Sequence, residues 1–172
     1  RPVVVYDAAN GMYAARAWWM LRWIGHDNVQ VLDGGWAAWL ATGGEIEAGS
    51  LAPTPVDAPH PLPDEPVMQT IGASELLAQP DRFTVIDARA PERYRGETEP
   101  LDPVAGHIPG ALNHPFTTNL HPDGRFLDAA TLRARFDELL GTAPARPVVQ
   151  QCGSGVTACH NLLAMAVAGR GD

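Results

Sequence analysis

The sequence contains no lysine, so its positive charge comes from 12 arginines, which are set against 20 acidic residues. The formal net charge is −8 at pH 7. Because binding to a nucleic-acid backbone requires clustered Lys and Arg, we predict no nucleic-acid partner. Long apolar runs are also missing, since none approaches the roughly 20 residues that cross a membrane, and the first residues lack the pattern of a signal peptide. We therefore predict a cytoplasmic protein with no membrane partner.

Cysteine is scarce, with two residues in a chain of 172. Two cysteines cannot build a disulfide framework, and they are typical of a reducing compartment. Cys152 and Cys159 are seven positions apart and His160 follows the second, but no further pair has the spacing of zinc ligands. We predict that the protein needs neither a metal ion nor another cofactor.

Proline is concentrated between residues 53 and 66, which hold six of the 16 prolines. No helix or central strand tolerates this density, so residues 50–69 are predicted to be a linker. On both sides of it, short β-branched runs alternate with helical patterns, which is the order of a parallel α/β fold. The predicted strands are 3–6, 29–32, 83–86 and 147–151, and the predicted helices are 14–24, 36–40, 75–78, 129–140 and 156–168. Ser74 and Asp128 are predicted to cap the helices that follow them.

Val3–Asp7 and Val148–Cys152 form an internal repeat, in which a strand, a loop of small residues and an Ala-rich helix follow one another. The two copies lie 145 positions apart, and the first has Asp7 where the second has Cys152. We therefore predict that residues 1–49 are the C-terminal part of an inactive domain. Residues 70–172 are predicted to be a second, catalytic domain that lacks its C-terminal end.

Cys152 opens a glycine-containing loop that joins a predicted strand to a predicted helix. The N–H groups of such a loop converge on the sulfur and the helix N-terminus adds partial positive charge, so both lower the thiol pKa. The backbone N–H donors are expected to come from Gly153, Gly155 and Val156. The hydroxyl donors are expected to be Ser154 and Thr157. Cys152 is thus predicted to be a nucleophile. The alternative is a small buried cysteine that happens to begin a helix.

The loop Cys152–Ala158 resembles the active loop of two-domain rhodanese-like sulfurtransferases, in the version found in 3-mercaptopyruvate sulfurtransferases. Four further stretches resemble the same family: Val31–Trp36, Val85–Arg89, Arg93–Gly96 and Gly106–Ala111. The resemblance implies an α/β fold of rhodanese-like domains in tandem. Each domain would be a mainly parallel sheet flanked by helices.

The resemblance also implies a sulfurtransferase in which Cys152 takes a sulfane sulfur from thiosulfate or 3-mercaptopyruvate and carries it as a persulfide. Cyanide or a thiol then accepts the sulfur, and a thioredoxin-like reductant is an expected partner. Arg93 is expected to bind the anionic donor with its guanidinium group; the alternative is a solvated loop arginine. The choice of donor stays open, because Asp102 stands where the family tends to carry a second substrate arginine.

Two other functions also fit a thiolate in a backbone cradle. A cysteine phosphatase needs the pattern Cys-x5-Arg, and the position of that arginine holds Ala158. A non-catalytic rhodanese-like module, used for binding or regulation, usually lacks the cysteine, as the first copy does at Asp7. The presence of Cys152 in an intact loop therefore favours the enzyme.

Three residues near the loop are expected to have structural roles. His107 is predicted to brace a turn through its ring nitrogens. Asp87 either orients Arg89 or caps the turn that follows its strand. Cys159 lies in the helix after the loop and is predicted to be a packing residue rather than a resolving thiol.

Overall fold

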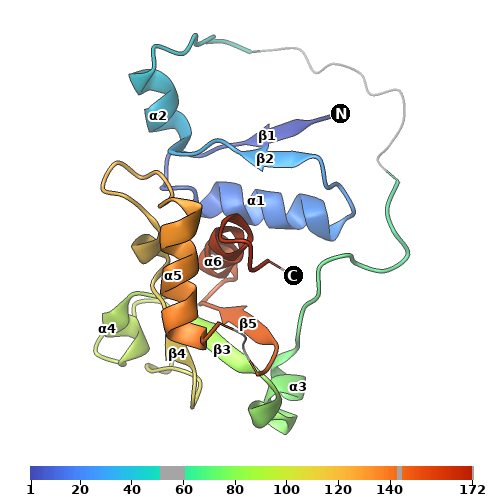
Figure 1. The fold of residues 1–172 in the computed structure, drawn as a ribbon, viewed down its shortest axis with the longest axis vertical. Coiled ribbons are helices and arrows are strands. Elements are labelled where there is room, and N and C mark those ends of the chain that lie inside the picture. Colours follow the sequence, from blue (N-terminus) through green and yellow to red (C-terminus); the bar gives the residue numbers. More distant parts are fainter. Residues whose placement is uncertain (51–60, 143–144, 172) are drawn as a thin grey trace.

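The computed structural model describes residues 1–50, 61–142 and 145–171. Most of the predicted linker, residues 51–60, lies outside these ranges, and its residues 61–69 form neither helix nor strand. Within the described ranges, no helix is long and apolar enough to cross a membrane. The described elements form an α/β fold of parallel strands flanked by helices, which confirms the predicted class (Figure 1).

The N-terminal residues form a two-stranded parallel sheet. β1 (Val3–Val5) pairs with β2 (Val29–Val31), with Val3 opposite Val29. Because parallel neighbours need a crossover connection, α1 (Met12–Trp23) joins the two strands, and α2 (Gly35–Ala41) follows β2. The prediction of these four elements is confirmed.

A second, three-stranded parallel sheet is formed by later residues. β3 (Thr84–Asp87) lies between β4 (Leu112–Asn113) and β5 (Val148–Gln151). The register places Gln151 opposite Asp87, so the ends of β3 and β5 meet at one edge of the sheet. The helices of this part are α3 (Ala73–Ala78), α4 (Pro91–Tyr94), α5 (Ala129–Leu140) and α6 (Val156–Val167), with short 3-10 helices at Pro80–Arg82 and Phe116–Asn119.

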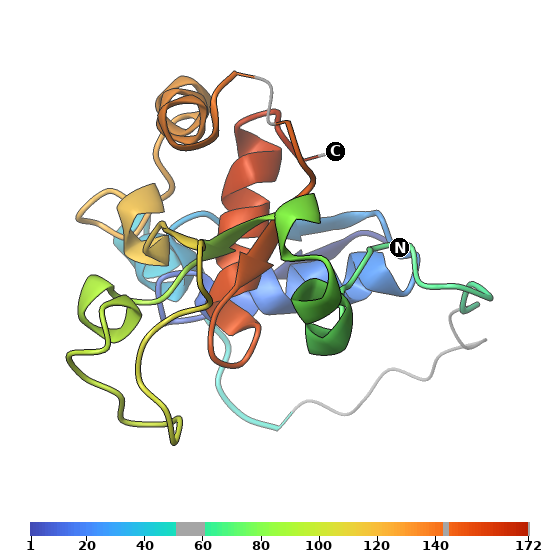
Figure 2. The same ribbon diagram turned by 90° about the horizontal axis from the view of Figure 1, so that it is seen from below.

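α1 and α6 cross and pack against each other between the two sheets (Figures 1 and 2). Their shared core contains Trp18 and Trp19 from α1 and Leu163 from α6. On another side of α6, Met165 packs in a cluster with Phe136 from α5. Full burial of one such side chain is worth about 1.5–3 kcal/mol. The helix that follows Cys152 is therefore held firmly on two sides.

The starts of two helices test the capping predictions. Asp128 caps α5 as expected, since its Oδ1 accepts the Thr131 N–H at 3.0 Å. The prediction that Ser74 caps α3 is wrong, because α3 already begins at Ala73 and the extended backbone of Gly72 supplies the N-cap conformation. α4 and β4 have no sequence signal of their own, since they comprise only four and two residues.

Candidate active site

Cys152 lies between β5 and α6, at the carboxyl edge of the three-stranded sheet. The Ala88 N–H donates to Gln151 O at 2.8 Å, so the chain that leaves β3 runs beside the cysteine. Gly155 is the N-cap of α6 with a φ of 80°, a conformation that glycine adopts without strain. Cys152 is half buried and lines a cavity of about 580 Å³. A small substrate can therefore reach this residue.

The Sγ atom of Cys152 accepts a hydrogen bond from the Gly155 N–H at 3.1 Å. Burial raises the pKa of the Cys152 thiol, but hydrogen bonds from the Thr157 hydroxyl and from the N–H groups of Ala158, Ser154 and Gly155 outweigh that effect. The pKa therefore lies below its ordinary value. A lowered pKa is the property of a nucleophilic cysteine.

The two residues that follow Cys152 lie toward solvent. Gly153 and Ser154 are exposed, and Val156 is half buried. Among the described residues, no hydrogen bond joins Sγ to the N–H of Gly153 or Val156, and the Ser154 hydroxyl has no protein partner. Of the three predicted N–H donors, only that of Gly155 therefore contacts Sγ in the part of the chain that the structure describes.

The first copy of the repeat holds a carboxylate in the same kind of loop. Asp7 accepts four backbone hydrogen bonds of 2.8–2.9 Å, from the N–H groups of Ala9, Gly11, Tyr13 and Ala14. Burial raises the pKa of Asp7, but these bonds outweigh it and lower the pKa. Gly11 is the N-cap of α1 with a φ of 79°, which matches Gly155. The repeated loop therefore favours negative charge, that of the Asp7 carboxylate in the first copy and that of the thiolate form of Cys152 in the second.

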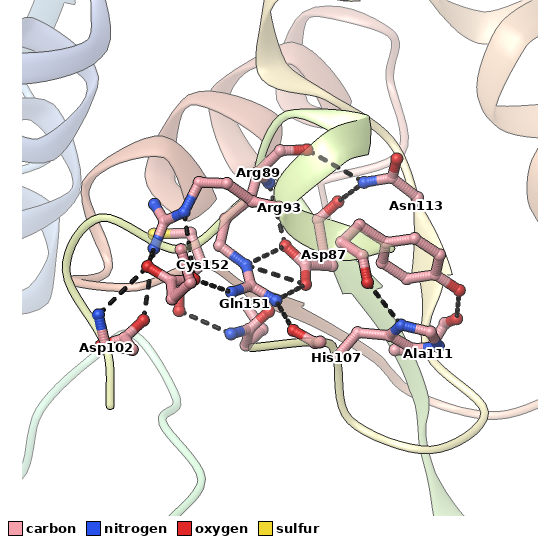
Figure 3. A network of polar contacts seen from close by, with 12 residues as sticks. Asp87, Arg89, Arg93, Asp102, His107, Ala111, Asn113, Gln151 and Cys152 are labelled. Atoms are coloured by element: carbon pink, nitrogen blue, oxygen red, sulfur yellow. Dashed lines mark hydrogen bonds and ion pairs between the residues drawn. The ribbon is translucent and has the colours of Figure 1, made fainter. Parts of the chain in front are cut away.

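Arg93, on α4, reaches the Cys152 loop and is held there by two carboxylates. Its Nη2 donates to Glu99 Oε1 at 2.6 Å and to Asp102 Oδ2 at 3.3 Å (Figure 3). The hydrogen bond from Arg93 outweighs burial and lowers the pKa of Glu99 to about 2. A Cβ atom added to Gly153 would lie 3.6 Å from Nη2. Arg93 is thus a fixed cation beside the Cys152 loop rather than a solvated side chain.

Arg89 is buried and connects the end of β3 to the loop that carries Glu99. Its Nε and Nη2 contact Asp87 Oδ2 at 3.1 and 2.7 Å, and its Nη1 lies 3.3 Å from Glu99 Oε2 (Figure 3). Nη2 also donates to Gly106 O at 2.6 Å. Asp87 has both expected roles, since it orients Arg89 and its Oδ1 also accepts the Arg89 N–H at 2.9 Å. Arg89 therefore fixes Glu99, and Glu99 fixes Arg93.

His107 braces the chain before β4, which confirms its predicted structural role. Its Nδ1 donates to Tyr94 O at 2.7 Å, and the two rings stack with their centroids 3.7 Å apart. The Tyr94 hydroxyl donates in turn to Ala111 O at 2.6 Å. These contacts tie α4, and with it Arg93, to the start of β4.

Arg16, on α1, enters the cavity of Cys152 although no motif in the sequence predicts it. Its Nη1 donates to Cys159 Sγ at 3.6 Å, and a Cβ atom added to Gly155 would lie 3.3 Å from Nη1. Cys159 is buried, which raises its pKa above the ordinary value despite the opposing effect of Arg16. Cys159 packs between α1 and α6, as predicted.

A buried polar network anchors β5 to α6 near the cysteine. Asn161 Nδ2 donates to Gln150 Oε1 at 3.1 Å and to His114 O at 3.0 Å, and Asn161 Oδ1 accepts from Asn119 Nδ2 at 2.8 Å. Burial lowers the pKa of the neighbouring His160 to about 4, so this ring is neutral at pH 7. In the part of the chain that the structure describes, no group of three or more His, Cys, Asp or Glu could hold a metal ion.

Replacing Thr157 with valine is expected to slow the alkylation of Cys152 by iodoacetamide at pH 7 by about tenfold. Valine keeps the β-branched shape but removes the hydroxyl that stabilises the thiolate, so the pKa of Cys152 rises. Because the thiolate is the reacting form, the pH of half-maximal alkylation rate moves upward. Thr42→Val is the control, because Thr42 is an exposed residue at the C-cap of α2. An unchanged pH profile in Thr157→Val would contradict the role of this hydroxyl.

Comparisons with known proteins identify the family of the chain. The family model described as Rhodanese-like domain matches residues 1–42 and 72–171. The chain is 50% identical over 170 residues to the probable 3-mercaptopyruvate sulfurtransferase of Pseudomonas aeruginosa, which covers 97% of this chain and 59% of the relative. It is 43% identical over 169 residues to the putative thiosulfate sulfurtransferase SseB of Mycobacterium tuberculosis. This match covers 98% of this chain and 59% of the relative.

The structure also resembles the crystal structure of SseA from Escherichia coli, which is described as a 3-mercaptopyruvate sulfotransferase. The TM-score is 0.81 and the identity 33%, over 98% of this chain and 63% of that one. The chain spans 59% of the length of the two curated relatives. Because the family model matches most of its residues and these relatives align along nearly all of it, the chain belongs to the family of rhodanese-like domains.

Proposed function

We propose that this chain is the sulfur-transferring part of a sulfurtransferase. Cys152 accepts a sulfane sulfur from thiosulfate or 3-mercaptopyruvate and passes it to cyanide or a thiol. One observation carries the proposal: the Cys152 thiol lies in a loop whose hydroxyl and N–H groups lower its pKa. The names of the relatives from P. aeruginosa and M. tuberculosis support it.

The first half-reaction forms a persulfide on Cys152. With thiosulfate, the thiolate attacks the outer sulfur, the S–S bond breaks, and sulfite leaves with the bonding electron pair. With 3-mercaptopyruvate, the thiolate attacks the thiol sulfur, the C–S bond breaks, and the released carbon takes up the thiol proton to give pyruvate. The negative charge moves to the outer sulfur of the persulfide, where the donors of the loop stabilise it.

The second half-reaction returns Cys152 to its thiolate form. The acceptor attacks the outer sulfur, and the S–S bond of the persulfide breaks with its electron pair going to Cys152. Because a thiol of lower pKa leaves faster, the loop that activates the nucleophile also favours this step. Cyanide becomes thiocyanate and a thiolate becomes a persulfide. A thioredoxin-like reductant is the thiol acceptor we propose.

Arg93 and four loop residues are proposed to bind the donor. Arg93 pairs with its carboxylate or sulfonate. The exposed Ser154 hydroxyl has no protein partner among the described residues, so it is available to the donor's oxygens. The N–H groups of Gly153, Gly155 and Val156 are proposed to hold the transferred sulfur. The Gly155 N–H already donates to Sγ at 3.1 Å, and Gly153 and Val156 are its neighbours in the same loop.

We further propose that residues 1–49 and 70–172 belong to two rhodanese-like domains in tandem, joined by residues 50–69. The N-cap glycines of α1 and α6 share their conformation, and the family model matches two separate stretches. The first domain is inactive because Asp7 stands at the position of the nucleophile. The two free cysteines favour a reducing compartment, and the proposed location is the cytoplasm.

The initial rates of thiocyanate formation test the proposed function. When donor and cyanide are varied together, a persulfide intermediate predicts parallel double-reciprocal plots. It also predicts a burst of sulfite or pyruvate without any acceptor. A sequential pattern would contradict the covalent intermediate. If neither donor supports sulfur transfer, the proposed enzymatic function would be contradicted and the non-catalytic module favoured. If both donors support it, the donor with the larger kcat/KM is the preferred one.

A further inference from the structure

Arg93 has two edges that can each hold an anion, and Glu99 occupies one of them. The Nε and Nη2 atoms of Arg93 lie 3.3 and 2.6 Å from the two carboxylate oxygens of Glu99. The Glu99 side chain is 4% exposed, and it also contacts Arg89 and the N–H groups of Leu101 and Asp102. Glu99 is therefore a permanent partner of Arg93.

The second edge of Arg93, formed by Nη1 and Nη2, faces the nucleophile loop. A Cβ atom added to Gly153 would lie 3.6 Å from Nη2 and 3.9 Å from Nη1, and Gly153 directly follows Cys152. Among the described residues, Nη1 of Arg93 has no hydrogen-bond acceptor. An anion bound at this edge would thus lie beside the reactive sulfur.

Asp102 already stands at this second edge. Its Oδ2 is 3.3 Å from Nη2 of Arg93 and 3.8 Å from the Cβ position on Gly153, and Figure 3 shows it bound to Arg93 beside Cys152. Unlike the buried carboxylate of Glu99, the Asp102 side chain is 46% exposed. Exposed ion pairs are weak, so Asp102 can leave Arg93 for solvent.

We propose that Asp102 occupies the position of the donor's anionic group on Arg93 and is a specificity-determining residue of this site. The inference rests on the proposed function. The donor's carboxylate or sulfonate displaces the Asp102 carboxylate from the Nη1–Nη2 edge, while Glu99 keeps the other edge. The donor then lies next to Gly153, with its sulfur toward Cys152.

Asp102 also makes the site selective by charge. Three carboxylates, those of Asp87, Glu99 and Asp102, surround Arg89 and Arg93, so the cluster has a net negative charge. The repulsion from Asp102 acts more strongly on the doubly charged thiosulfate than on the singly charged 3-mercaptopyruvate. Asp102 is therefore expected to favour 3-mercaptopyruvate as the donor.

Donor binding to the Cys152→Ser chain, with and without Asp102→Asn, tests this inference in the absence of sulfur transfer. Asparagine keeps the size of the side chain and removes its charge. Isothermal titration is expected to show 3-mercaptopyruvate binding about threefold tighter and thiosulfate binding about tenfold tighter after this change. Asp123→Asn is the matched control, because Asp123 is 63% exposed and lies 3.9 Å from Arg125. It is expected to leave both dissociation constants unchanged.

Unchanged or weaker binding of both donors to Asp102→Asn would overturn the inference, since Asp102 would then only hold Arg93 in position. The inference would also be overturned if Asp123→Asn tightened donor binding as much as Asp102→Asn does, because the change in net charge alone would then explain the effect. If Asp102→Asn lowered the dissociation constants of thiosulfate and 3-mercaptopyruvate by the same factor, the proposed selectivity by charge would be overturned. Failure of the proposed function is seen separately, as a lack of sulfur transfer to cyanide by the unsubstituted chain.

Discussion

Replacing Cys152 with serine is expected to abolish sulfur transfer to cyanide, with kcat lowered by at least about a thousandfold. A serine hydroxyl does not ionise near neutral pH and cannot form a persulfide. The Thr157 hydroxyl and the N–H groups that lower the pKa of Cys152 remain in place, so the loss reports on the sulfur atom alone. The measurement is the rate of thiocyanate formation with thiosulfate and with 3-mercaptopyruvate.

Cys159→Ala is the matched control for this prediction. Cys159 lies in the core between α1 and α6, and its Sγ accepts a hydrogen bond from Arg16. Removing its thiol is expected to keep sulfur transfer within a few fold of the unsubstituted rate, because the cradle of Cys152 contains no Cys159 atom among its donors. Transfer that survives in Cys152→Ser and disappears in Cys159→Ala would reverse the assignment of the nucleophile.

Replacing Arg89 with methionine is expected to lower the free energy of unfolding by about 3–5 kcal/mol. Asp87 is completely buried, and the Arg89 guanidinium contacts it at 2.7 Å. Methionine keeps an apolar stem of similar length but leaves the Asp87 charge buried without its partner. Glu99 loses a contact as well. Urea denaturation followed by tryptophan fluorescence measures the change.

Arg95→Met is the control for Arg89→Met, because it removes the same side chain from an exposed ion pair. Arg95 contacts Glu97 at 2.6 Å, but both side chains are about half exposed. Exposed pairs contribute little to stability, so Arg95→Met is expected to unfold at nearly the same urea concentration as the unsubstituted chain. Equal losses in the two variants would contradict the role of the buried Asp87–Arg89 pair.

The fold class and the position of the Cys152 loop were predictable because their signals are local. A β-branched strand, a loop with glycine and an Ala-rich helix follow one another at Cys152, and the structure has β5, the loop and α6 in that order. Asp128 was predictable as a cap because the hydrogen bond to Thr131 spans three residues. Ser74 carries the same type of signal, but Gly72 begins the helix earlier.

The surroundings of Cys152 were not predictable, because they depend on contacts between distant residues. Glu99 lies ten positions after Arg89, in a loop whose return to β3 has no sequence pattern. Arg16 and Cys159 are 143 positions apart, and they meet only because α1 packs across α6. Asp102 departs from a family pattern that is visible in the sequence, but its contact with Arg93 depends on the folded loop.

The most direct test of a persulfide on Cys152 is the intact mass of the protein after incubation with each donor and no acceptor. The unsubstituted chain is expected to gain one sulfur atom, cyanide is expected to remove it, and Cys152→Ser is expected to gain none. A chain that gains no sulfur from either donor, or that gains it equally in Cys152→Ser, would contradict a persulfide on Cys152.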